Sequence, residues 1–312
     1  MAAFLGSLSA LGQKPPTSIA GVREMSVSMA HLCADPAAAA PLADKRDFSV
    51  ETPNGQKRMR LYSPNEPTSD ALVIYIHGGG WVQGSIDTFD LNMHFFCSEM
   101  QVRVLFTEYR RAPENLYPAA LEDCVETLDW AYENADELGI NPDRISLCGD
   151  SAGGNLAAAV ILSQRLREAN GMGQPKLPSV RSALLLYPCV DFRSIADERP
   201  SRKNDADPLL PLAGLRQCQT QYAGDADPND PLLSPLCAPT LEGFPPTVVA
   251  VAPIDPVRDE GVLFAARLKS EGAGCELLEF PGMIHGFFYM QEKVGAANTA
   301  SLKCIDEFKK LI

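Results

Sequence analysis

The stretch SLCGDSAGGN, at residues 146–155, decides the fold of this chain. A short apolar run at 145–148, typical of a buried strand, leads into it, and a run of good helix formers follows at 156–166. The sequence therefore predicts a strand, a sharp turn and a helix, with Ser151 on the turn.

Ser151 is the centre of a G-x-S-x-G pattern, whose glycines at 149 and 153 let the strand and the helix approach closely. The amide of Ala152 lies at the expected N-terminus of the helix, where unpaired N–H groups favour negative charge. A nucleophile thus stands beside a donor for an oxyanion. Because a structural serine in a glycine-rich turn gives the same short pattern, the rest of the chain must supply a base, an acid and further donors.

The composition is that of a globular protein. The 312 residues, 46% hydrophobic and 21% charged, suit one α/β enzyme with insertions. Lys and Arg number 27 against 40 Asp and Glu, and the net charge of −13 argues against a nucleic-acid or anionic-membrane partner.

Cysteine usage and the apolar runs bear on the compartment. The nine cysteines form no C-x-x-C pair, and we expect buried free thiols, which suit a reducing cytoplasm. No apolar run reaches the roughly 20 residues of a membrane span. Residues 1–13 lack the basic region of a signal peptide. We therefore expect a cytoplasmic protein.

Strands alternate with helices along most of the chain. An Asn54-Gly55 pair predicts a hairpin between strands at 47–52 and 57–62. Further strands are expected at 71–76, 102–107, 145–148, 183–187, 247–252 and 275–280, and helices at 118–138, 156–166, 215–222, 260–271 and 297–312. This order predicts an α/β fold, with a mostly parallel eight-stranded sheet flanked by helices.

Two segments fall outside this alternation. Residues 1–45 are alanine-rich and helical in pattern, with Met25, Met29 and Leu32 on one face, and we expect an N-terminal cap segment. Core packing is the competing explanation for those side chains. Residues 192–245, punctuated by prolines, are expected to form a second cap segment. The catalytic α/β domain then comprises 46–191 and 246–312.

A glycine-rich loop, His77-Gly78-Gly79-Gly80-Trp81, follows the apolar strand at 71–76. Its amides can come close to a ligand. A phosphate loop is disfavoured, because no Gly-Lys-Ser/Thr follows. We expect His77 to hold the loop by hydrogen bonds. Trp81 either lines the substrate pocket or fills the core beneath it, and the same two alternatives hold for Phe287.

A serine nucleophile needs a base, and the chain has four histidines, at 31, 77, 94 and 285. His285 lies just past the last strand, at the sheet edge where the carboxyl ends of parallel strands meet. Asp255, directly after the 247–252 strand, is the favoured acid to orient it. Asp150 is expected to point away from Ser151 as a structural acceptor. Asp259 and Glu260 suit the start of the next helix.

One further pair has a structural explanation. Arg110 and Glu114 follow the 102–107 strand. A catalytic role is open to them, but we expect a structural ion pair that braces their loop.

The order Ser151, Asp255, His285, together with HGGGW at 77–81 and GDSAG at 149–153, resembles the bacterial hormone-sensitive-lipase-like esterases of the GDSAG type, which are α/β-hydrolases. The similarity covers roughly residues 45 to 312. It includes YR at 109–110, APE at 112–114, PAA at 118–120, ED at 122–123, DP at 255–256, DEG at 259–261 and HGF at 285–287. Arg111 and Glu108 depart from the usual leucine and aspartate, which bears on loop packing.

The resemblance implies an α/β-hydrolase fold with a helical cap and hydrolysis of carboxylic esters through an acyl-enzyme. Ser151 would attack the ester, His285 would move the proton, and Asp255 would hold the imidazole tautomer. The oxyanion would be bound by amides of residues in the two glycine-rich motifs, namely Gly79, Gly80 and Ala152, with Gly78 shaping the loop.

The implied partner is a small-molecule ester. No metal or organic cofactor is expected, and a homodimer through the last strand and helix is consistent with the resemblance. The short polar cap segments favour short- to medium-chain acyl groups. An amidase, a lipase and a non-catalytic small-molecule receptor on this scaffold stay open as alternatives.

Overall fold

The computed structural model describes residues 18–33, 37, 39–169 and 179–312, and within these residues eight strands form one sheet. The order across the sheet is β1-β2-β4-β3-β5-β6-β7-β8. The strands are β1 (Asp44–Thr52), β2 (Gly55–Ser63), β3 (Leu72–Ile76), β4 (Arg103–Thr107), β5 (Ile145–Asp150), β6 (Ala183–Leu186), β7 (Thr247–Val251) and β8 (Cys275–Glu279).

The sheet begins with an antiparallel hairpin and continues as a parallel sheet. β1 pairs with β2 so that Thr52 lies opposite Gly55, which is the turn that Asn54-Gly55 predicts. β2 is antiparallel to β4, and every later pair, from β4–β3 to β7–β8, is parallel. The carboxyl ends of the parallel strands therefore meet at one edge of the sheet. The predicted fold class is confirmed.

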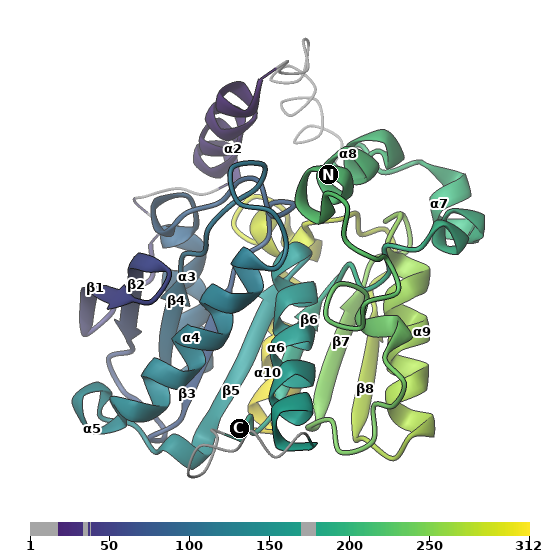
Figure 1. Cartoon of the computed structure of the whole chain (residues 1–312). Coiled ribbons are helices and arrows are strands. Elements are labelled where there is room, and N and C mark those ends of the chain that lie inside the picture. The colour runs from purple at the N-terminus through teal and green to yellow at the C-terminus, as the bar shows by residue number, and fades with distance from the viewer. Residues whose placement is uncertain (1–17, 34–36, 38, 170–178) are drawn as a thin grey trace.

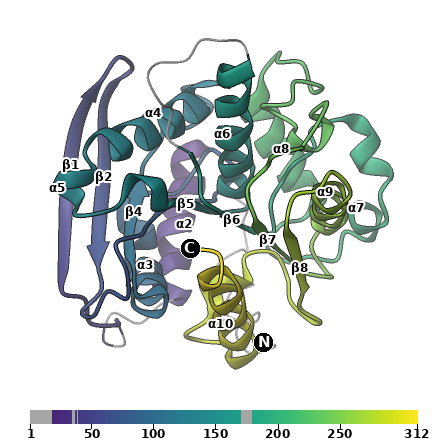
Figure 2. The same cartoon turned by 90° about the horizontal axis from the view of Figure 1, so that it is seen from below.

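Helices cover both faces of the sheet (Figures 1 and 2). α3 (Ile86–Met100) and α10 (Gly295–Lys309) lie on one face, and α4 (Ala119–Glu133), α6 (Ala152–Ala169) and α9 (Arg258–Ser270) lie on the other. The side chains of β3 alternate between the two cores. Leu72, Ile74 and Ile76 join one apolar cluster, while Val73 and Tyr75 join the other. An apolar strand of this kind is buried on both faces.

Two helices differ from the sequence expectation. The helix expected over 118–138 is two helices, because the chain bends at Asn134 between α4 and α5 (Ala135–Leu138). α3 has no counterpart among the helices expected from the sequence. Its start is fixed by Ser85, whose side chain accepts from the Thr88 amide while the Thr88 hydroxyl accepts from the Ser85 amide. The usual sequence pattern of this reciprocal cap has Glu or Gln at the third helical position. Because Thr88 occupies that position here, the pattern does not detect this helix start.

The segments outside the sheet lie at its carboxyl edge (Figure 1). α2 (Ile19–Cys33) comes from the N-terminal segment, and α7 (Pro200–Asn204) and α8 (Leu212–Ala223) come from the excursion at 192–245. Short 3-10 turns complete the chain at Pro142–Arg144, Ser194–Glu198, Pro235–Cys237 and Phe287–Met290. The prolines at 15–16 and the stretch at 1–13 lie outside the described residues.

All nine cysteines are free thiols, six of them buried. Burial raises the pKa of these thiols, that of Cys97 to about 12, so they are protonated and pack as small apolar groups. In the described part of the chain, no helix is long and apolar enough to cross a membrane.

Candidate active site

Ser151 lies on the turn between β5 and α6 with a φ of +54°, a left-handed conformation that is rare for a residue with a side chain. The flanking glycines allow this turn. A Cβ at Gly149 would lie 2.3 Å from the Gly153 carbonyl oxygen, and a Cβ at Gly153 would lie 1.9 Å from the Ile76 carbonyl oxygen. Larger residues would push β5, α6 and β3 apart, so the pattern around Ser151 is required by packing.

The structure brings His285 and Asp255 to Ser151. The Nε2 atom of His285 lies 2.8 Å from Ser151 Oγ, and its Nδ1 atom lies 2.7 Å from Asp255 Oδ2. Because a carboxylate accepts hydrogen bonds, Nδ1 carries the proton and Nε2 is left to accept from the serine hydroxyl. Asp255 is fully buried, and its other oxygen accepts from the Val257 amide at 2.9 Å.

The electrostatic surroundings favour the charged form of His285. Burial, the largest single effect, lowers the pKa of the imidazole, but the charge and hydrogen bond of Asp255 together with the charges of Asp207 and Asp150 outweigh it. The pKa of His285 therefore lies above its ordinary value of 6.5. A proton taken from Ser151 would be held by an imidazole that three carboxyl groups face.

The loop after β3 has two positions, 79 and 80, at which only glycine fits. Gly79 has a φ of +108°, and a Cβ there would lie 2.5 Å from the Gln83 carbonyl oxygen. Gly80 has a φ of +58°, and a Cβ there would lie 2.6 Å from Cys218 Sγ. Within the described residues, the amide nitrogens of Gly79 and Gly80 have no hydrogen-bond acceptor. Together with the Ala152 amide at the start of α6, they are available to a ligand.

Asp150 ties this loop to β5. Its carboxylate accepts from the Gly78 amide at 2.9 Å, from the Tyr75 hydroxyl at 3.1 Å and from the Tyr289 hydroxyl. Burial raises the pKa of Asp150 to about 6, against the opposing effect of these bonds. A Cβ at Gly78 would lie 2.1 Å from Asp150 Oδ2, so the approach needs glycine. Asp150 is thus an acceptor beneath the loop and does not contact His285 by a hydrogen bond.

His77 lies beneath the same loop and away from Ser151. Its ring is fully buried, stacks on Tyr109 with centroids 4.2 Å apart, and lies 2.7 Å through Nδ1 from the Gly78 carbonyl oxygen. Burial lowers the pKa of His77 to about 3, so the ring is neutral and Nδ1 donates that bond. This places His77 as a support for the loop.

Two aromatic residues of the motifs lie in the core. Trp81 is 1% exposed and stacks on Tyr222 at 4.7 Å, and Phe287 is fully buried against Tyr187 and Phe280. Neither lines the cavity beside the glycine loop. For both residues the structure thus shows core packing, one of the two alternatives that the sequence left open.

The expected pair of Arg110 and Glu114 does not form. Arg110 bonds Asp123 and Glu122 at the start of α4, at 3.1 and 3.0 Å. Glu114 instead bonds Arg23 of α2, with two contacts of 2.9 and 2.7 Å. The loop is braced at two separate residues, because Arg110 pairs with two carboxylates of α4 and Glu114 pairs with Arg23 of α2.

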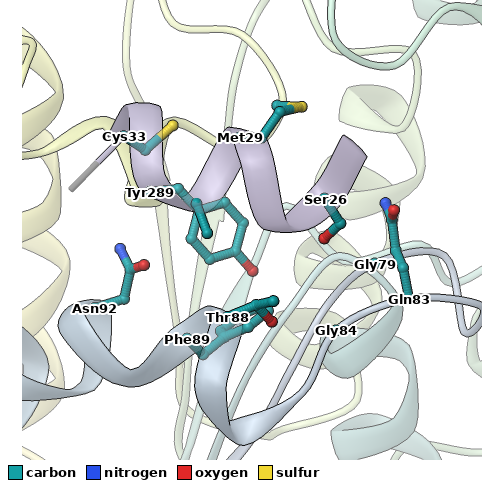
Figure 3. Close-up of a pocket in the computed structure, with 11 residues that line it drawn as sticks. Ser26, Met29, Cys33, Gly79, Gln83, Gly84, Thr88, Phe89, Asn92 and Tyr289 are labelled. Carbon is teal, nitrogen blue, oxygen red and sulfur yellow. The ribbon is translucent and has the colours of Figure 1, made fainter. Parts of the chain in front are cut away.

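A cavity of about 120 Å³ lies between α2, α3 and the glycine loop (Figure 3). Two of its lining residues adjoin the motifs around Ser151, namely Tyr289, which bonds Asp150, and Gly79 of the glycine loop. Its other walls are Ser26, Met29, Ala30 and Cys33 from α2, Gln83 and Gly84 from the loop, and Thr88, Phe89 and Asn92 from α3.

Sequence reasoning missed two residues near this centre. Asp207, from the excursion at 192–245, accepts from the His285 amide at 2.5 Å. Tyr289 bonds Asp150 and lines the cavity. Asp207 belongs to no motif, and only the position of Tyr289 four residues after His285 could have drawn attention to it. Among the described residues, no group of His, Cys, Asp and Glu side chains is arranged to hold a metal ion.

Comparisons with known proteins agree with this geometry. A family model described as alpha/beta hydrolase fold matches residues 73–289. The chain is 38% identical to the carboxylic ester hydrolase LipN of Mycobacterium tuberculosis, over 83% of this chain and 69% of the relative, and 34% identical to an arylesterase of Saccharolobus solfataricus, over 79% and 78%. A hyperthermophilic esterase from Pyrobaculum calidifontis superposes with a TM-score of 0.86, at 30% identity, over 97% of this chain and 96% of that one.

Proposed function

Because the chain belongs to the α/β-hydrolase family and is a serine carboxylic ester hydrolase of the hormone-sensitive-lipase-like type, we propose that it cleaves short- to medium-chain acyl esters through an acyl-enzyme on Ser151. The observation that carries the proposal is the hydrogen-bonded chain from Ser151 through His285 to Asp255, at 2.8 and 2.7 Å. Nucleophile, base and orienting acid are each within bonding distance of the next.

In the acylation step, Ser151 Oγ attacks the ester carbonyl carbon while its proton passes to His285 Nε2. The imidazolium then formed keeps its Nδ1–H bond to Asp255. The negative charge on the carbonyl oxygen is bound by the amides of Gly79, Gly80 and Ala152. Collapse of this intermediate breaks the bond to the alcohol, which takes the proton from Nε2 of His285.

In the deacylation step, water enters as the alcohol leaves. His285 takes a proton from this water, which attacks the acyl carbon of the Ser151 ester. The same amides bind the second oxyanion. The bond to Ser151 then breaks, its oxygen regains the proton, and the carboxylic acid departs.

The cavity beside Gly79 supports the limit on acyl length. Its volume of about 120 Å³ is small against the roughly 300–1,000 Å³ of common ligand pockets. Its apolar walls at Met29, Ala30 and Phe89 suit a short hydrocarbon chain. The acyl group of the substrate would lie here, with its carbonyl oxygen toward the loop.

The two segments at the carboxyl edge would act as the cap over this site. In the first, residues 1–45, the described helix α2 forms one wall of the cavity. The second, residues 192–245, would enclose the opposite side of the reaction centre, where Asp207 reaches His285. The α/β domain would then comprise 46–191 and 246–312.

The test is hydrolysis of p-nitrophenyl esters from acetate to palmitate by the wild type and by Ser151→Ala. The matched control is Ser163→Ala, on helix α6 that follows Ser151. Among the hydrogen bonds of the described residues, its hydroxyl bonds only the Val160 carbonyl. We expect activity on the short and medium esters, a loss of kcat on the order of 10⁴-fold or more in Ser151→Ala, and wild-type kcat in the control. An organophosphonate should add one mass label to the wild type and none to Ser151→Ala.

Other outcomes would redirect the proposal. A preference for palmitate over butyrate would indicate a lipase and refute the role of the small cavity. Hydrolysis of anilides in preference to esters would indicate an amidase. A folded wild type that binds esters without hydrolysing any of them would support the receptor alternative.

A homodimer is a further part of the proposal. β8 lies at the edge of the sheet, with three half-buried and two exposed residues, and it could pair with β8 of a second copy. Sedimentation at several protein concentrations tests this, since a constant monomer mass would contradict it.

A further inference from the structure

Asp207 reaches the reaction centre from a part of the chain that has no catalytic motif. It lies between α7 and α8, in the proposed second cap segment, and only 3% of it is exposed. A carboxyl group almost completely removed from water is costly unless its oxygens are bonded. The hydrogen-bond donors to Asp207 therefore indicate which parts of the chain its carboxylate holds in place.

Both oxygens of Asp207 are occupied by backbone amides. Oδ1 accepts from the amides of Leu209 and Leu210, at 2.8 and 3.1 Å, which closes its own turn. Oδ2 accepts from the amide of His285 at 2.5 Å. One oxygen thus fixes the cap loop and the other fixes the backbone of the proposed general base.

The contact continues at the next residue. Gly286 has a φ of +73°, so the backbone turns sharply after His285. A Cβ at Gly286 would lie 3.9 Å from Leu209 Cδ1, so the Leu209 side chain of the cap loop lies close to this turn. The cap loop therefore holds the His285 turn through the hydrogen bond of Asp207, with Leu209 beside it.

We propose that Asp207 is a positioning residue for His285, which ties the cap to the general base and adds a second carboxylate to stabilise the imidazolium. The inference rests on the proposed role of His285. Asp255 sets the ring through Nδ1, and Asp207 sets the backbone that carries the ring. Without Asp207, the ring would keep its bond to Asp255 but lose the anchor that aims Nε2 at Ser151.

The charged and polar groups around His285 come from several elements. Asp255 follows β7, Asp207 comes from the cap loop, Asp150 ends β5, Ser151 lies on its turn, and the Tyr187 ring after β6 lies 4.9 Å from the imidazole. After the dominant effects of burial and Asp255, the Asp207 charge also raises the pKa of His285. Removing that charge lowers this pKa.

The decisive variant is Asp207→Asn, with Asp205→Asn as its control. An asparagine has one acceptor oxygen and cannot serve both its own turn and the His285 amide. Asp205 lies on the same loop, is exposed, and accepts from the Leu212 amide, so its substitution removes the same charge without touching His285. kcat is measured on p-nitrophenyl butyrate per serine that reacts with a stoichiometric organophosphonate, so that misfolded protein does not count.

We expect Asp207→Asn to lower kcat about tenfold to a hundredfold, the range of a small displacement of a catalytic group, with a smaller change in KM. The acid limb of kcat/KM should move to lower pH, because the pKa of His285 falls. Asp205→Asn should match the wild type in kcat and in the position of the acid limb. If Asp207→Asn is not recovered folded, Asp207→Ser, which keeps an acceptor without the charge, is judged by the same criteria.

The result that overturns the inference is an Asp207 variant with the kcat and acid limb of Asp205→Asn. That failure is distinct from failure of the proposed function, in which Ser151→Ala would keep its activity. A lower kcat with an unmoved acid limb would also refute the electrostatic part, since a purely structural role predicts that pattern.

Discussion

Arg23 is expected to control how firmly α2 closes the acyl cavity. Within the described part of α2, only Cys33 is buried, so the helix has little apolar contact to hold it. Arg23 supplies polar contacts instead. Its guanidinium bonds the Val82 carbonyl at 2.9 Å, the Ala112 carbonyl at 3.2 Å and both oxygens of Glu114.

The size of the effect follows from these contacts. The Glu114 side chain is 54% exposed, so its ion pair with Arg23 contributes at most about 1 kcal/mol. The two part-buried bonds to carbonyls add roughly 0.5–1 kcal/mol each. Arg23→Met, which keeps the stem and the helix propensity, should therefore weaken docking of α2 by about 2 kcal/mol. That is about thirtyfold in the ratio of docked to undocked helix.

Two assays measure this change. Amide hydrogen exchange in α2 should accelerate by up to about thirtyfold. The ratio of kcat/KM for p-nitrophenyl octanoate over butyrate should rise, because the cavity wall at Met29 and Cys33 is displaced. High salt on the wild type should give a smaller change, since it screens the ion pair and leaves the carbonyl bonds.

Arg144→Met is the matched control, because Arg144 forms an exposed ion pair with Asp70 far from the cavity in the fold. If Arg23→Met shows the exchange rates and the ester ratio of this control, the reasoning is refuted. α2 would then be held by contacts other than those of Arg23, or would not limit acyl length.

Three further predictions concern the loop and the titrating groups. Gly79→Ala should lower kcat on the order of a hundredfold at similar KM, because its Cβ would lie 2.5 Å from the Gln83 carbonyl oxygen and displace an oxyanion donor. Asp150→Asn should flatten the pH dependence of the free energy of unfolding measured in urea. Burial raises the pKa of Asp150 from 3.8 to about 6, so the wild type should lose on the order of 3 kcal/mol of stability as the pH rises between those values. The pKa of His285 is raised above 6.5. As pH rises through that pKa, activity should increase because the base becomes neutral, and the stability contributed by its charged form should decrease. Activity and stability that change in the same direction would contradict this.

The strands could be predicted from the sequence because their signals are local. β3 is five consecutive apolar residues, and the β1–β2 hairpin is set by Asn54-Gly55. Both depend only on neighbours along the chain. Helix boundaries were less accurate, since the break at Asn134 and the cap at Ser85 depend on one or two side-chain hydrogen bonds. The alignment of strand ends then followed from the parallel topology.

The errors concern contacts between distant segments. Glu114 bonds Arg23, 91 residues away, rather than the neighbouring Arg110, and Asp207 bonds His285, 78 residues away. No local pattern encodes such pairs, because an exposed or loop carboxylate accepts from whichever donor the fold presents. Trp81 illustrates the same limit, since its motif fixes its position in the chain and the packing of Tyr222 decides that it is buried.

Two aspartates show how one turn separates two tasks. Asp150 precedes Ser151 directly, yet Asp255, about a hundred residues later, is the one that bonds His285. The left-handed conformation of Ser151 lifts its hydroxyl toward the imidazole, while the Asp150 carboxylate stays under the glycine loop and bonds Gly78. The neighbouring acid therefore holds the loop of the proposed oxyanion donors, and the distant acid holds the proposed base. A substitution that relaxes the turn should disturb both at once, which is why the glycines at 149 and 153 matter as much to the proposed chemistry as the residues that perform it.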